Sequence, residues 1–112
     1  MALAGPPLKQ VTIWYDKEKT EIKEVYFIKD VKGKHYYDST FTSYYQSGKI
    51  KSEGHYLNNN LDGRWKFFYE SGSIKAKGYY NDSQQDSLWT YYYENGTVSS
   101  KGELLKGKKV GN

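Results

Sequence analysis

The sequence predicts an all-β protein, an elongated single-layer antiparallel β-meander of repeated hairpins, and three observations support this fold class. A block of 24 residues recurs three times in register from Phe41 onward. Aromatic residues make up 18% of the chain, and 13 residues are tyrosine. The segments between the aromatic runs are short and rich in Gly, Asn, Asp and Ser. A fixed period of this size indicates a repeat array, in which each unit buries its apolar face against its neighbours.

Each copy of the block carries the same residue types at the same places. A large ring opens the copy, a pair of aromatic residues follows, and two glycines flank an aliphatic residue further on. Side chains alternate across a strand, so the opening ring and the second aromatic of the pair share one face. We expect three columns to be structural, and they are Phe41, Trp65, Trp89; Tyr45, Tyr69, Tyr93; and Gly54, Gly78, Gly102.

Within one copy, the aromatic run that begins at Trp65 predicts a strand, and Gly72 after it predicts a turn. A two-residue or a four-residue loop gives the same register. The pairs expected in this hairpin are Trp65 with Gly78, Phe67 with Ala76, and Tyr69 with Ile74. A three-residue loop with a bulge would pair Trp65 with Lys77, so we expect one of the other two loops. The missing side chain of Gly78 would then leave room for the Trp65 indole.

The block also predicts the domain organisation. We expect one repeat domain over residues 8–112, and its units are a divergent unit 8–38 and repeats 39–62, 63–86 and 87–112. A terminal unit that departs from the others is typical of capping in repeat proteins. We interpret residues 1–7 as a disordered N-terminal segment, left by cloning or by removal of a leader. Whether the chain is part of a longer array stays open.

The composition argues against several classes of function. The net charge is only +4 and acidic and basic residues are interleaved, whereas nucleic-acid binders cluster their basic residues. Cysteine is absent, which excludes disulfides and thiolate metal sites. No apolar run approaches the ~18 residues of a membrane-spanning helix. We therefore expect a soluble protein, either cytoplasmic or exported with its leader removed.

No set of residues has the pattern of a catalytic or metal site. His35 and His55 stand 20 residues apart and belong to no repeated ligand set. The glycines are explained by turns or by neighbouring rings, so no phosphate-binding loop is expected. The sequence predicts no enzyme activity, no catalytic residues, no cofactor and no metal.

The face opposite the large rings is the predicted partner-binding surface. Aromatic residues recur on it at 24-residue steps, beside lysines. Its members are Tyr44, Lys51, Lys66, Phe68, Lys75, Tyr92 and Lys101. Aromatic and basic side chains anchor protein interfaces well, so the row is suited to recognition. The alternative is that the face is simply solvated.

The residues of the block resemble a known family. Segments 65–72 and 89–96, the Ile-Lys-x-x-Gly-x-Tyr pattern that follows the first of them, and the Asp62-Gly63 linker are similar to the bacterial variant of the MORN repeat (membrane occupation and recognition nexus). The resemblance implies a non-catalytic scaffold that binds a protein, and, for this variant, an antitoxin-type protein whose partner is a toxin. Ser87 in place of the linker glycine and Phe41 in place of Trp depart from the pattern.

Three functions remain open at this point. The first is a protein-interaction scaffold with an unidentified partner. The second is binding of anionic lipid, a membrane surface or another polyanion through the Lys and aromatic rows. The third is wall-glycan binding, because aromatic hairpin repeats also occur in cell-wall-binding modules. Self-association through unpaired sheet edges is a further expectation, with residues 97–105 as the exposed edge.

Overall fold

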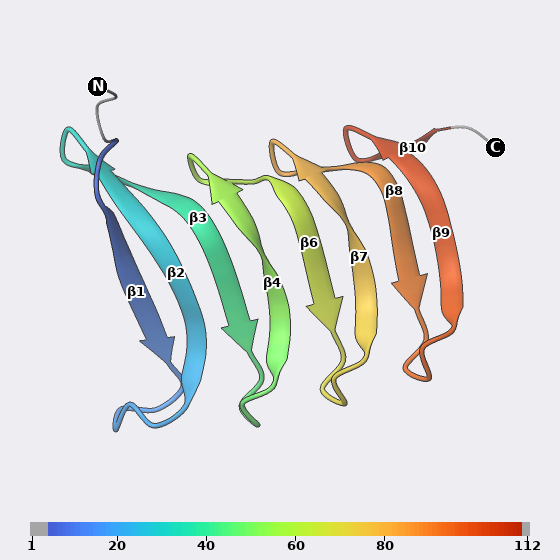
Figure 1. Cartoon of the computed structure of the whole chain (residues 1–112), viewed down its shortest axis with the longest axis horizontal. Coiled ribbons are helices and arrows are strands. Elements are labelled where there is room, and N and C mark those ends of the chain that lie inside the picture. The colour runs from blue at the N-terminus through green and yellow to red at the C-terminus, as the bar shows by residue number, and fades with distance from the viewer. Residues whose placement is uncertain (1–4, 111–112) are drawn as a thin grey trace.

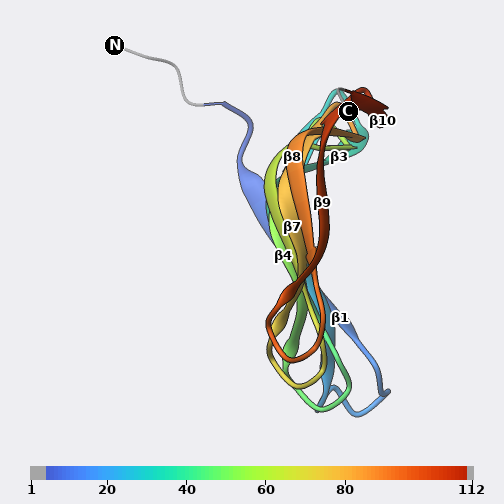
Figure 2. The ribbon, with the colours of Figure 1, turned by 90° about the vertical axis from the view of Figure 1, so that its right-hand side faces the viewer.

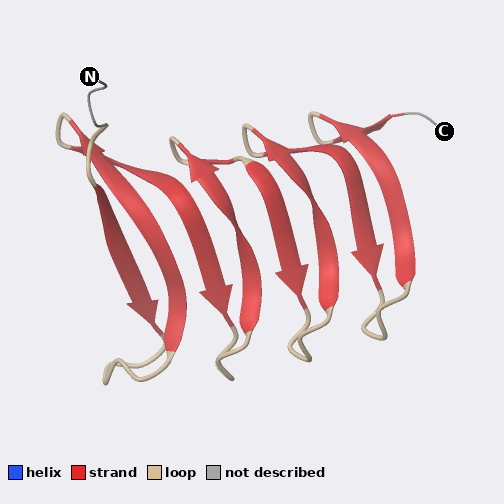
Figure 3. Ribbon diagram, viewed as in Figure 1, coloured by secondary structure: helices blue, strands red, loops and turns tan. Residues whose placement is uncertain are grey.

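The computed structural model describes residues 5–110 and places them in one ten-stranded antiparallel sheet (Figures 1 and 3). The strands are β1 Leu8–Trp14, β2 Ile22–Val31, β3 Lys34–Tyr44, β4 Ile50–Leu57, β5 Asn60–Leu61, β6 Gly63–Phe68, β7 Ile74–Asn81, β8 Gln84–Tyr92, β9 Val98–Leu105 and β10 Lys108–Val110. Of the segment predicted to be disordered, residues 1–4 lie outside the described part of the chain, and residues 5–7 precede β1 without joining the sheet.

The sheet is a meander, as the repeat pattern predicted. Strands that follow one another in sequence are neighbours in the sheet, and the short β5 pairs with the end of β4. Viewed on edge, the strands form a single twisted layer (Figure 2). The extents of 46 × 38 × 24 Å agree with this shape. The all-β fold class with successive hairpins is confirmed.

One face of the layer carries the aromatic core, and we call it the aromatic face. Trp65, Ala76 and Trp89 are its buried centre, with exposed fractions of 3%, 5% and 1%. The partly buried residues packed against them are Phe41, Tyr56, Leu61, Phe67, Tyr80 and Leu104. Since these rings have no second sheet above them, they cover one another. The Tyr80 ring, for example, packs edge-on against the Trp89 indole, with 5.1 Å between the ring centroids.

The register of the hairpins is partly as predicted. Trp65 pairs with Gly78 as expected, but Ile74 pairs with Phe68 and not with Tyr69. The expected two-residue or four-residue loop is also wrong. The Tyr69 amide donates to the Ser73 carbonyl at 2.8 Å, and this hydrogen bond closes a three-residue loop instead. Gly72 makes this loop possible because its φ is +100°, in the left-handed region that glycine adopts at little cost.

A second irregularity explains why Trp65 still reaches Gly78. The register shifts between Phe67 and Phe68, so that Lys75 on β7 is left without a partner across the strand pair. This bulge compensates for the odd loop and restores the pairing further along the hairpin. The same shift occurs after Ser43 in β3 and after Tyr91 in β8, so the device is part of the repeat.

The expected contact between Trp65 and Gly78 is also wrong, although the two residues pair. A Cβ atom built on Gly78 would lie 2.2 Å from Cδ2 of Trp89, and one built on Gly54 would lie 2.0 Å from Cδ2 of Trp65. Each indole therefore lies over the glycine of the preceding hairpin. Its Nε1 donates to a carbonyl on that same strand, from Trp65 to His55 at 3.1 Å and from Trp89 to Tyr79 at 2.8 Å. The Trp–Gly contact joins two repeats.

Two further links join successive repeats at the two ends of the strands. At one end, tyrosine hydroxyls donate to carbonyls of the next repeat, from Tyr45 to Phe68 at 2.6 Å and from Tyr69 to Tyr92 at 2.7 Å. At the other end, linker amides donate back to the preceding linker. These bonds run from Asn59 N to Tyr37 O, from Ser83 N to Leu61 O and from Gly107 N to Gln85 O, at 2.8–2.9 Å. The two interfaces that contain Trp65 and Trp89 thus each have a hydrogen-bonded link at both ends and the indole between them.

Candidate interaction surface

The face opposite the aromatic core, which we call the reverse face, has a basic hollow between β6, β7 and β8. Its volume is about 430 Å³. The residues that line it are Arg64, Trp65, Lys66, Lys77, Gly78, Tyr79, Ser87, Leu88 and Thr90. Three of these carry a positive charge and none carries a negative one. Tyr79 and Leu88 add apolar surface, with exposed fractions of 40% and 47%. We call this site the basic hollow.

Strand alternation puts these side chains on the reverse face. Arg64 and Lys66 flank Trp65 on β6, so they point away from the face on which the indole is buried. Arg64 pairs with Tyr79 across the strands, and its Nε donates to the Tyr79 hydroxyl at 2.6 Å. This hydrogen bond raises the pKa of Arg64 above its ordinary value and fixes the guanidinium over the ring, 5.6 Å from the ring centroid.

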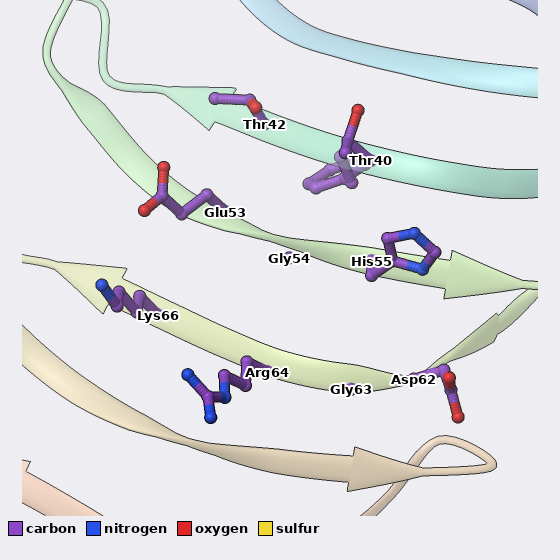
Figure 4. Close-up of a pocket in the computed structure, with 10 residues that line it drawn as sticks. Thr40, Thr42, Glu53, Gly54, His55, Asp62, Gly63, Arg64 and Lys66 are labelled. Atoms are coloured by element: carbon purple, nitrogen blue, oxygen red, sulfur yellow. The ribbon is translucent and has the colours of Figure 1, made fainter.

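A second hollow adjoins the first on the same face, between β3, β4 and β6 (Figure 4). Its volume is about 590 Å³. Thr40, Thr42, Glu53, His55, Asp62, Arg64 and Lys66 are among the residues that line it. Arg64 and Lys66 are shared with the basic hollow, whereas Glu53 and Asp62 make the charge here mixed. The reverse face thus becomes more basic from β4 towards β7.

The structure does not bring the seven predicted binding residues together in one site. Lys66 lines both reverse-face hollows. Tyr92 lies under Lys77, whose Nζ is 5.9 Å from the ring centroid. Lys101 is exposed on β9, opposite Thr90. Tyr44 lines a separate hollow beside the loop that precedes β2.

The other three predicted residues belong to a hollow on the aromatic face. Lys51, Phe68 and Lys75 line it together with aromatic-face residues such as Trp89. The two lysines occupy the bulge positions, so strict alternation from the loop misplaces them. Each lysine instead lies over the tyrosine that precedes its loop, Lys51 over Tyr45 and Lys75 over Tyr69, both at 5.7 Å.

Of the residues that line the basic hollow, only Lys66 was among the seven predicted ones. Arg64, Tyr79 and Leu88 belong to no 24-residue column of identical residues, so the repeat pattern does not distinguish them. Because side chains alternate along a strand, their positions next to Trp65, Gly78 and Trp89 predict that these three side chains lie on the reverse face. What the sequence could not supply is the Arg64–Tyr79 contact, which depends on the register.

The described part of the chain has no group of three or more His, Asp or Glu side chains placed to hold a metal ion. None of residues 5–110 lies in a helix long and apolar enough to cross a membrane.

Comparison with known protein families identifies the repeat. Residues 37–58, 61–82 and 85–105 match the family described as MORN repeat variant, and together they cover more than half of the chain. No curated protein and no solved structure matches this chain. Repeats of this family are generally binding or scaffold motifs and not catalytic, and they often mediate contacts with proteins or membranes. The chain belongs to the MORN repeat variant family.

Proposed function

We propose that this protein is a non-catalytic interaction scaffold that binds an acidic, partly apolar segment of a partner protein in the basic hollow. The observation that carries the proposal is the lining of that hollow. Three cations stand beside an exposed Tyr79 and Leu88, and no carboxylate lines the site.

The chemistry of the lining defines the partner. Arg64 is already held by the Tyr79 hydroxyl, so less side-chain freedom is lost when it pairs with a carboxylate. Arg and Tyr are the residue types that most often dominate binding energy in interfaces. Leu88 offers an apolar contact next to them. A partner segment that combines Asp or Glu with a large apolar side chain satisfies both requirements.

Binding of anionic lipid or another polyanion is the second candidate. The lysines of the reverse face support it, but Glu53 and Glu103 also lie on the reverse face and interrupt its positive charge. A polyanion would gain little from Tyr79 and Leu88. We therefore rank a protein segment first and use salt dependence to separate the two.

Wall-glycan binding is disfavoured for the repeat tryptophans. A ring that stacks on a sugar must offer one of its faces to solvent. Trp65 and Trp89 are 3% and 1% exposed, so neither indole has a free face.

The family resemblance suggests a finer identity for the partner, namely a toxin that the scaffold neutralises by covering it. Co-expression with a toxin encoded next to this protein tests that identity directly. Rescue of growth by the wild-type chain and not by an Arg64→Glu/Lys77→Glu variant would support it. Equal rescue by both would place any neutralising contact elsewhere.

The general proposal is tested by selection from a peptide library on the full chain. We expect selected peptides to pair Asp or Glu with an aromatic or aliphatic residue, and to bind in about 150 mM salt. Arg64→Ala and Tyr79→Ala should each weaken binding by roughly tenfold, the effect of removing one anchor. The matched control is Lys75→Ala, which removes a cation from the aromatic face and should leave the affinity unchanged.

Three outcomes would contradict the proposal. Selection could yield no peptide, or the two substitutions could leave binding as it is. Heparin or vesicles containing phosphatidylserine could also bind as tightly as the best peptide, with an affinity that falls steeply as salt rises.

A further inference from the structure

At β9, the last long strand of the described sheet, the features that join one repeat to the next have no partner repeat within residues 5–110. β9 pairs with β8 along its length, whereas on its other side only the segment from Glu103 onward is paired, with β10, within the described residues. The part of β9 from Val98 to Gly102 is therefore an open strand edge.

Gly102 is the first of these features. It stands 24 residues after Gly78 and pairs with Trp89 as Gly78 pairs with Trp65. At Gly54 and Gly78 an indole fills the space of the missing side chain. At Gly102 the nearest atom to an added Cβ is Cε of Lys109, at 3.2 Å. This atom lies near the end of a flexible side chain, so an entering ring can displace it.

Tyr93 is the second feature. It is the counterpart of Tyr45 and Tyr69, whose hydroxyls donate to carbonyls of the next repeat. The Tyr93 side chain is 58% exposed, and its hydroxyl has no hydrogen bond within residues 5–110. The Lys109 carbonyl is the third feature, because it corresponds to the linker carbonyls of Leu61 and Gln85 that accept from the next linker.

We infer that this edge is a binding site for an extended, acidic strand that carries Trp-x-aromatic, supplied by another polypeptide. The strand would pair antiparallel with β9. Its indole would lie over Gly102, and its second aromatic would face Ser100, as Phe67 faces Ser52 and Tyr91 faces Ala76. A carbonyl beyond that aromatic would accept from Tyr93. This is strand addition to an open sheet edge, a recurring mode of peptide recognition.

The charge of the edge selects the occupant. Lys101, Lys106, Lys108 and Lys109 lie on β9, on β10 or between them, against the single acid Glu103 in 98–110. An acidic strand is therefore favoured over a basic one. Residues 84–94 of this chain have the required form, with Trp89, Tyr91 and two acids but no basic residue.

A second copy of the chain is a poorer occupant. The other edge strand of the described sheet is β1, which runs in the same direction as β6 and β8 (Figure 1). The Tyr15 hydroxyl donates to the Tyr44 carbonyl as Tyr69 does to Tyr92, so Tyr15 and Tyr69 are equivalent. Four residues earlier, β1 has Val11 where β6 has Trp65. Edge-to-edge pairing of two copies would leave the Gly102 site without a ring.

The test is the binding of a fluorescein-labelled peptide with the sequence of residues 84–94 to the full chain, followed by fluorescence anisotropy. We expect saturable binding to the wild-type protein, and binding roughly tenfold weaker to Gly102→Val, whose side chain occupies the place of the indole. Tyr93→Phe should weaken it by about fivefold through loss of one hydrogen bond. The same peptide with Trp89→Ala should bind poorly to every form.

Lys51→Ala is the matched control, because it removes a cation remote from the edge and should leave the affinity as it is. Melting of Gly102→Val, followed by circular dichroism, establishes that this variant is folded. The inference is overturned if the peptide does not bind the wild-type chain by about 1 mM, if Gly102→Val binds it equally well, or if the Trp89→Ala peptide binds as tightly as its parent.

Discussion

At Gly54 and Gly78 the space of the absent side chain is filled by an indole that belongs to the following repeat. The residue type at these positions is therefore dictated by a neighbour in space that is ten or more residues away along the chain. Gly102 has the same place in the repeat but meets only Lys109. The three glycines thus differ in what a larger side chain would cost, and that difference is measurable.

The first prediction compares Gly78→Val with Gly102→Val. A valine at 78 would overlap the Trp89 indole, so this variant should lose about 3 kcal/mol of unfolding free energy. A valine at 102 displaces only the end of a lysine and should change stability by less than about 0.5 kcal/mol. Urea unfolding followed by circular dichroism measures both. Equal losses in the two variants would contradict the assignment of the indole to Gly78.

The tyrosine hydroxyls between repeats allow a similar comparison. Tyr69→Phe removes the donor to the Tyr92 carbonyl and should cost about 1 kcal/mol, the usual contribution of one hydrogen bond. Tyr93→Phe removes an exposed hydroxyl and should cost nothing measurable. Both are read from the midpoint of urea unfolding. If Tyr93→Phe is the more destabilising change, the link between repeats has been misassigned.

Tyr26 makes stability depend on pH. Pairing of its hydroxyl with that of Tyr37, together with burial, raises its pKa from 10.0 to about 12. The unfolded chain loses this proton first, so the contribution of Tyr26 is complete below pH 10 and is lost as pH rises from 10 to about 12. Urea unfolding at about pH 9 and about pH 11 should show a smaller loss of stability for Tyr26→Phe than for wild type. The same loss in both would exclude this role.

At the scale of single elements, the hairpin depends on two compensating irregularities. The loop after Tyr69 has three residues and needs a left-handed residue at Gly72, and the bulge at Lys75 then returns the strands to the register of the core. Either irregularity alone would shift the pairing by one residue and move the rings to the wrong face. The loop and the bulge are therefore retained together in each repeat.

The loop yields a prediction of its own. An added Cβ at Gly72 would meet nothing within 4 Å, so Gly72→Ala causes no steric clash. Its only destabilising effect is the strain of an alanine at φ +100°. We expect a loss of about 1–2 kcal/mol for Gly72→Ala and a smaller loss for Gly72→Asn, since Asn tolerates left-handed backbone better. Thermal unfolding of the two variants gives the order. A neutral Gly72→Ala would mean that the loop takes another form.

The same hairpin shows how far the sequence could predict the structure. The 24-residue period gave the meander, the pairing of Trp65 with Gly78 and the structural role of the rings. It could not reveal the bulge, because two shifts that cancel leave the periodic pattern unchanged. The bulge in turn puts Lys51 and Lys75 in a hollow on the aromatic face, so the predicted binding row was divided between two faces. The direction in which an indole leans along the sheet is likewise not encoded in residue spacing.

For the whole molecule, the consequence is a core that lies along one face of a single sheet, centred on Trp65, Ala76 and Trp89. Each repeat contacts only its neighbours, so stability is approximately a sum of terms for units and interfaces. The most buried side chain at the interfaces of Trp65 and Trp89 is the tryptophan itself, which lies over the glycine of the preceding repeat. The reverse face carries the charged residues of the basic hollow. Within residues 5–110, β9 is unpaired on one side from Val98 to Gly102.

The contact of Trp65 and of Trp89 with the preceding repeat is tested most directly by fluorine NMR of the chain labelled with 5-fluorotryptophan. The chain has three tryptophans, and each should give one resonance that can be assigned by substitution. We predict that Gly54→Val shifts the Trp65 resonance most and that Gly78→Val shifts the Trp89 resonance most. If Gly78→Val instead displaces Trp65 and leaves Trp89 unchanged, each indole packs within its own hairpin, and the interface between repeats described above is wrong.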